Sequence, residues 1–182
     1  MSQDQADFTQ DVRATLLQLL ATDENVREVL RQLFAAPQTP AMESGSFAAE
    51  RQLLDCIAAD PPLRDAWLNA DEPVERQLVR LIATASQWDR LLQLQDHLAA
   101  RCKDEQRSVS ARERQILAGS LALHNLIWRE HQASLLDARV GAPFDPLSHD
   151  RGTLQGHTVS EQWLPGLRNA AGQVQRKPLV RT

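Results

Sequence analysis

The stretch GSLALHNLIWREHQASLLDARVGAPFDPLSH, residues 119–149, decides the fold because two kinds of pattern meet within it. Up to Val140 apolar residues recur at helical spacing, whereas from Gly141 onward glycine and proline interrupt the chain. Five of the 7 glycines in the chain lie after Val140. We therefore predict a helix over 111–139. A small β-rich segment over 141–182 should follow it and either dock against another part or stay partly loose, because its apolar content is too low for an independent core.

The predicted helix over 111–139 has a defined beginning. Ser110 and Glu113 form a capping box, in which the hydroxyl accepts from the amide three residues on and the carboxylate reaches back. A second helix is predicted over 72–107. Because only a short turn separates the two helices, we expect an antiparallel pair. Inside the later helix Gly119 costs roughly 1 kcal/mol relative to alanine, so it serves either close packing or the approach of a partner.

The helix predicted over 72–107 carries a seam of mostly apolar residues spaced alternately by four and three. The seam consists of Val74, Leu78, Leu81, Ala85, Trp88, Leu92, Gln95, Ala99 and Cys102. A heptad seam this narrow is typical of helix-on-helix packing, either between subunits or within one chain. Four of these residues, Leu78, Leu81, Trp88 and Leu92, are the candidates for a dimer contact.

The N-terminal part of the chain is predicted to be helical with proline-rich linkers. Helices are expected over 12–20 and 22–36, the second capped by Thr22, and a linker over 37–46. A third helix should contain Leu53 and Ile57, and Asp60-Pro61-Pro62 should start a short fourth one. The predicted organisation is an N-terminal helical region over 1–70, a helix pair over 71–140 and the β-rich segment over 141–182.

Composition limits the classes of function. The 182 residues carry a net charge of −4, but residues 1–75 hold 14 acids and 5 bases (−9) and residues 76–182 hold 10 acids and 15 bases (+5). The bases do not alternate with aromatic residues, so nucleic acid is a weaker candidate partner than an acidic protein surface.

No apolar run is long enough to cross a bilayer and no signal-peptide pattern appears, so we expect a cytoplasmic protein with no membrane partner. Cys56 and Cys102 are expected to be two small buried thiols.

Catalytic and metal-binding patterns are missing from the sequence. No phosphate-binding loop, HExxH, nucleophile elbow or paired-cysteine site is found, so we predict no enzyme activity, cofactor or metal site. His124 and His131 are interpreted as ordinary helix-surface histidines. Asp145 and His149 are interpreted as turn residues, with the aspartate accepting backbone amides and the histidine closing the turn.

Four groups of residues together resemble the GrpE family, the nucleotide exchange factors of DnaK-type heat-shock chaperones. The most specific is Gly141-x-x-Phe144-Asp145-Pro146-x-x-His149. The others are Asp89-Arg90-x-Leu92 in the first long helix, Gly119 in the second, and a C-terminal series consisting of Gly166, Gly172, Val174, Arg176 and Val180. The resemblance covers roughly residues 76–182.

The resemblance implies a mainly α protein, with a dimeric helical bundle or coiled-coil pair and a small β domain that opens the chaperone's nucleotide cleft. It implies partner-binding roles for Asp89, Arg90, Gly119, Phe144, Asp145, Pro146, His149 and Arg176. Ser86, Arg151 and Leu167 depart from the family pattern, and the His149-to-Gly166 spacing is short, which predicts a truncated β domain. Two alternatives stay open: a helical scaffold without exchange activity that binds another protein, and a DNA-binding regulator that uses the arginine-rich half.

Overall fold

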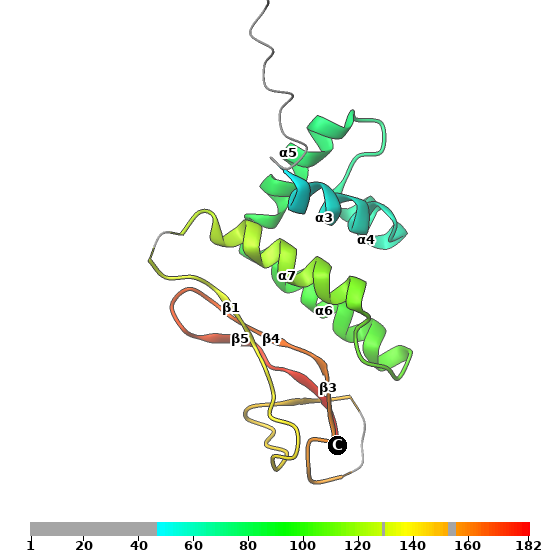
Figure 1. The fold of residues 1–182 in the computed structure, drawn as a ribbon. Helices are drawn as coiled ribbons and strands as arrows, with labels where there is room; N and C mark the ends of the chain where they lie inside the picture. Colours follow the sequence, from blue (N-terminus) through cyan, green and yellow to red (C-terminus); the bar gives the residue numbers. More distant parts are fainter. Residues whose placement is uncertain (1–46, 129, 153–155) are drawn as a thin grey trace, which may run out of the picture. The chain divides into compact units, whose positions relative to one another are not determined.

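The helices of the described chain precede its strands. The computed structural model describes residues 47–128, 130–152 and 156–182, which form five helices and six strands (Figure 1). The helices predicted over 12–20 and 22–36 and the linker over 37–46 lie outside the described residues.

Helices α3 (Ala48–Ala58) and α4 (Pro61–Trp67) form as the sequence predicts. The prolines occupy the first turn of α4, where no backbone donor is lost, and the Oδ1 of Asp60 accepts from the Leu63 amide at 3.4 Å. These two helices bury apolar side chains in the same core as the later helices, and α3 packs on α7 and α5. Residues 47–70 are therefore part of the main helical body.

The helix predicted over 72–107 is in fact two helices, so the prediction of one continuous helix is wrong. Helix α5 spans Val74–Ala85 and α6 spans Trp88–Asp104, with a break at Ser86–Gln87. The Ser86 hydroxyl donates to the Ala83 carbonyl at 2.8 Å, and the Gln87 backbone is extended. Such side-chain bonds to the backbone compete with helix continuation. Because of the break, the buried residues of α6 differ in part from the predicted seam; they are Leu91, Leu94, Gln95, Leu98 and Cys102.

Helix α7 (Ala111–Asn125) starts at the predicted capping box, with Glu113 N to Ser110 Oγ at 3.2 Å and Ser110 N to Glu113 Oε2 at 2.8 Å. Its predicted extension to residue 139 is wrong. The Asn125 side chain bonds both the amide and the carbonyl of Ala133, at 2.9 and 2.8 Å, and so closes a loop where a helix would continue. The first strand, β1 (Ser134–Leu136), follows this loop.

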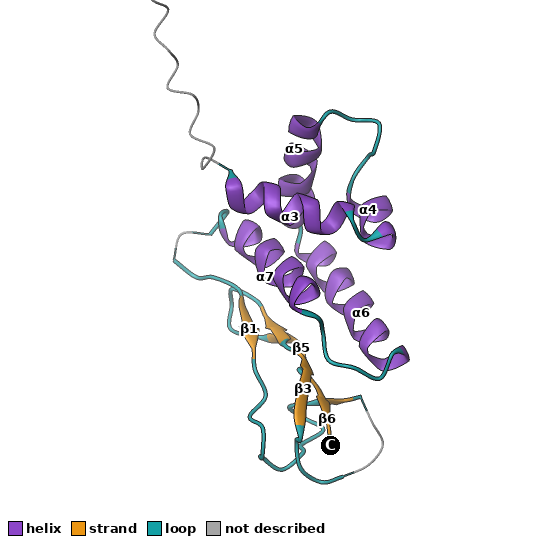
Figure 2. Ribbon diagram, turned by 45° about the vertical axis from the view of Figure 1, so that its right-hand side comes forward, coloured by secondary structure: helices purple, strands orange, loops and turns teal. Residues whose placement is uncertain are grey.

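The C-terminal part forms two three-stranded sheets (Figure 2). Its further strands are β2 (Asp150–Arg151), β3 (Glu161–Leu164), β4 (Gly166–Arg168), β5 (Val174–Arg176) and β6 (Leu179–Arg181). One sheet has the order β1-β4-β5 and is antiparallel; the other has the order β2-β6-β3, in which β2 pairs with β6 in parallel. Gly166 is needed where β4 passes the β5–β6 turn, because a Cβ there would lie 2.4 Å from the Arg176 carbonyl oxygen.

The strands dock on α6, and α6 lies beside α7 (Figure 1). Trp163, Leu164, Leu167 and Leu179 of the strands belong to the same buried cluster as the helical core. The amide of Val109, between α6 and α7, donates to the Trp163 carbonyl at 2.9 Å. The described chain thus combines a helical majority with small β sheets, and of the two alternatives for the C-terminal segment it shows the docked one.

Candidate functional site

A polar groove lies between one face of α6 and part of the β segment, and two side chains bridge it. Arg176 of β5 holds Asp96 of α6 with two bonds, Nε to Oδ1 at 2.6 Å and Nη2 to Oδ2 at 2.8 Å. This carboxylate raises the pKa of the Arg176 guanidinium. The groove has a volume of about 320 Å³ and is lined mainly by charged and small residues, namely Gln95, Asp96, Ala99, Ala100, Lys103, Asp104, Asp150, Arg176, Lys177 and Leu179. We call it the α6 groove.

The turn over 144–149 has the conformation predicted for it. The Oδ1 of Asp145 accepts from the Leu147 amide at 2.9 Å, and its Oδ2 accepts from the Ser148 hydroxyl at 2.6 Å. These bonds, the Ser148 hydroxyl foremost, lower the pKa of Asp145. The His149 Nδ1 accepts from the Asp145 amide at 3.3 Å and so closes the turn.

The turn is fixed to the wall of the α6 groove. The Nζ of Lys177 donates to the Pro146 carbonyl at 2.7 Å. Behind the turn, the Arg151 guanidinium lies 4.0 Å from the centre of the Phe144 ring, a cation–π contact. The side chain of Leu147 at the tip is 85 % exposed. Because Lys177 follows Arg176 directly in the chain, this bond places the 144–149 turn next to Arg176.

The other sequence-predicted residues lie farther along the helices. Asp89 and Arg90 are exposed in the first turn of α6, where Arg90 Nη1 donates to Gln93 Oε1 at 3.1 Å. Asp89 and Asp96 are seven residues apart, so they share one face of α6. Gly119 lies elsewhere: a Cβ added to it would lie 3.1 Å from Leu53 Cδ1 of α3. It lines an apolar hollow of about 120 Å³ together with residues of α3 and α7.

The dimer candidates lie on α5 and α6, partly inside the chain's own core. Leu81 is fully buried, with no exposed side-chain surface. Leu78, Trp88 and Leu92 are half-buried against the core of the described unit.

His124 is not the helix-surface histidine that the sequence suggests. It is 4 % exposed, and both ring nitrogens have partners: Trp128 Nε1 donates to Nε2 at 3.1 Å, and Nδ1 lies 2.9 Å from the Ser86 carbonyl oxygen. The Trp88 ring lies 5.2 Å from the imidazole, centroid to centroid. The four-residue spacing of His124 and Trp128 could have indicated their contact from the sequence. Ser86 could not be foreseen, because its carbonyl is free only through the helix break.

Sequence reasoning also missed an ion-pair network where the helix ends meet. Arg107 holds Glu113 with two bonds at 2.6 and 2.9 Å. Arg101 bonds both Glu113, at 3.1 Å, and Asp60, at 2.6 Å. The Arg107 bonds, with the Ser110 groups and Arg101, lower the pKa of Glu113 to about 2. The network joins α4, α6 and α7.

Among the described residues, no group of three or more His, Cys, Asp or Glu side chains is placed to hold a metal ion. Both cysteines are free, and burial raises the pKa of the Cys102 thiol to about 11, which keeps it protonated and unreactive. Within the same residues no helix has the length and apolarity to span a membrane.

Comparison with known protein families, with curated proteins and with solved structures found no match. The α6 groove and the 144–149 turn together carry charged side chains held in place by the bonds described above.

Proposed function

We propose that this protein is a co-chaperone similar to the GrpE family, which binds the ATPase domain of a DnaK-type chaperone and promotes ADP release. The observation that carries the proposal is the fixed position of the Phe-Asp-Pro turn. Lys177, in the wall of the α6 groove, holds the turn through the Pro146 carbonyl, and Arg176 beside it clamps that wall to α6 through Asp96.

The mechanism requires no catalytic residue. A protein that binds the open, nucleotide-poor state of a chaperone more tightly than the closed state weakens nucleotide binding by the same factor. Each 1.4 kcal/mol of this preference is about tenfold in the nucleotide dissociation constant.

A lever of this kind must be joined firmly to the element that aims it. The strands share a core with α6, so the segment acts as one body with the helix. Asp89 lies on the α6 face that carries Asp96, two turns toward the N-terminus. A partner resting on the β segment can therefore also reach the start of α6, which gives two points of contact for prying two lobes apart.

The test measures release of a labelled ADP from the cognate DnaK-type chaperone by stopped flow, with and without this protein. We expect acceleration, and we expect Arg90→Ala to weaken it without unfolding the protein. Arg64→Ala is the matched control, since Arg64 pairs only with its neighbour Asp65 in the described structure. Binding without acceleration would favour the adaptor alternative, and absence of both would end the proposal.

We further propose that the protein is a dimer through the outer faces of Leu78, Trp88 and Leu92 on α5 and α6. Leu81 would then support these residues from within the core. Sedimentation velocity of the full chain should give a dimer that Trp88→Ala weakens and Val79→Ala, an exposed α5 residue outside the predicted seam, does not. A monomer at all concentrations would remove the dimer proposal and leave the exchange proposal standing.

A further inference from the structure

Buried His124 is held in one protonation state by its two hydrogen bonds. An indole N–H can only donate, so the Nε2 of His124 must accept from Trp128 across their 3.1 Å bond. The ring proton then lies on Nδ1 and donates to the Ser86 carbonyl across 2.9 Å. The two bonds together require a neutral imidazole.

The two partners of His124 are points where regular structure ends. Ser86 is the break between α5 and α6, and its carbonyl is not used by either helix in the described hydrogen bonds. Trp128 follows the end of α7 and is 44 % exposed, next to Leu126 and Ile127, which are 72 % and 56 % exposed. The Trp88 and Trp128 rings lie 5.2 and 6.3 Å from the imidazole. One histidine thus fastens a helix break to the apolar residues that follow α7.

Within residues 47–128, 130–152 and 156–182, no charged side chain is bonded to the His124 imidazole. None of the charged side chains described on the elements packed against this part of α7 is hydrogen-bonded or ion-paired to the imidazole. On these elements and after Trp128 they are Glu50, Arg51 and Asp55 of α3, Glu75, Arg76 and Arg80 of α5, Asp89 and Arg90 of α6, and Glu130 and His131.

We infer that His124 is an acid-sensitive latch, which holds Trp128 when neutral and releases it when protonated. A proton on Nε2 turns the acceptor into a donor that faces the indole N–H, and it places an unpaired charge at a buried site. Both effects favour departure of Trp128. Acidification supplies this proton, so the release accompanies a fall in pH. The released indole would enlarge the apolar surface formed by Leu126 and Ile127.

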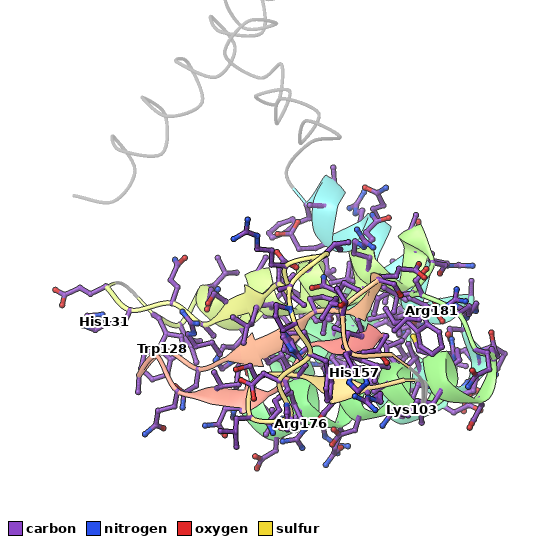
Figure 3. The ribbon with its side chains drawn as sticks, turned by 90° about the horizontal axis from the view of Figure 1, so that it is seen from below. Lys103, Trp128, His131, His157, Arg176 and Arg181 are labelled. Atoms are coloured by element: carbon purple, nitrogen blue, oxygen red, sulfur yellow. The ribbon has the colours of Figure 1, made fainter. Side chains whose placement is uncertain are left out.

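The test uses the full chain labelled with ¹⁵N at tryptophan and histidine. At pH 8, ring ¹⁵N spectra should show His124 as the Nδ1–H tautomer. Between pH 8 and 5 the Trp128 indole signal, assigned by its loss in Trp128→Phe, should leave its position reversibly, while the buried Trp67 and Trp163 indoles hold theirs. Figure 3 shows Trp128 and His131 together at one end of the described unit, away from Lys103, so His131→Gln is a local control that should leave the transition unchanged.

His124→Gln should abolish the movement of the Trp128 signal. A Trp128 signal that stays fixed from pH 8 to 5 in the wild type would overturn the latch, as would equal movement in folded His124→Gln. If that variant does not fold, the tautomer decides: an Nε2–H ring at pH 8 contradicts the inference, because that nitrogen could not accept from Trp128.

Discussion

At the scale of single residues, Glu113 is the centre of a network of ion pairs and hydrogen bonds. Its side chain is 6 % exposed and is bonded by Arg107, Arg101 and Ser110. Removing its charge takes from Arg107 and Arg101 one carboxylate partner each, at a nearly buried site, so Glu113→Gln should lower the free energy of unfolding by about 2–3 kcal/mol at pH 7. Urea unfolding measures the loss. Glu75→Gln, at an exposed first-turn position of α5, should change it by less than about 0.5 kcal/mol.

The same residue predicts a dependence of stability on pH. Its pKa falls from 4.5 in the unfolded chain to about 2 in the folded one. The stabilisation, about 3 kcal/mol at most, is present above pH 4.5 and is lost as the pH falls toward 2. Urea unfolding between pH 6 and 3 should therefore show a steeper loss of stability in the wild type than in Glu113→Gln. Parallel curves would mean that Glu113 has an ordinary pKa in the folded protein.

Gly166 and Gly119 should differ in how much a substitution by alanine destabilises the protein. A Cβ at Gly166 meets backbone, 2.4 Å from the Arg176 oxygen, whereas one at Gly119 meets the flexible Leu53 side chain at 3.1 Å. Gly166→Ala should cost more than about 2 kcal/mol of unfolding free energy and Gly119→Ala less than about 1 kcal/mol. Thermal unfolding of both variants compares them directly. Equal losses would contradict the close passage of β4.

Residue roles were predictable where the partners are near in sequence. Asp145 with His149, and Ser110 with Glu113, act within three or four positions, so turn and capping chemistry reveals them. His124 depends on Ser86, and Arg176 on Asp96, at separations of 38 and 80 residues. Only the folded chain brings such pairs together.

At the scale of elements, the ion pair of Arg176 and Asp96 joins β5 to α6. The side chains of Arg176 and Asp96 are 32 % and 53 % exposed, so the pair should contribute no more than about 1 kcal/mol to global stability. Its effect should be local: Asp96→Asn should speed hydrogen exchange of the β5 amides while leaving α7 unchanged. Asp104→Asn, also on the groove, is the control. Uniform acceleration across both elements would show that the pair supports the whole fold instead.

The starts of α4 and α7 were predictable, whereas the break between α5 and α6 and the end of α7 were not. Pro61 and Ser110 mark beginnings through local chemistry. The break at Ser86 and the end of α7 at Asn125 depend on bonds to His124 and Ala133, and apolar periodicity continues through both points. A heptad pattern records which side chains can be buried; it does not record where the backbone turns.

For the described unit as a whole, the shared core predicts that strands and helices unfold together. Leu167 of β4 is fully buried and belongs to the cluster that holds the helical residues. Leu167→Ala should therefore lower stability by about 2–4 kcal/mol and shift far-ultraviolet circular dichroism and tryptophan fluorescence by the same amount. Val174→Ala, at an exposed strand position, is the control. Fluorescence that changes before the helical signal would mean that the sheets are a separate unit.

The strand order β2-β6-β3 has a consequence for how the molecule assembles. β6 lies between two strands that both precede it, so neither can find its neighbour in that sheet until residues 179–181 arrive. Pairing across such a separation is slow compared with helix formation. We expect the helices to form first, while β2 and β3 still lack β6, the middle strand of their sheet. The partly folded chain with these unpaired strand edges is therefore more prone to aggregation, above all at high concentration, than the folded protein.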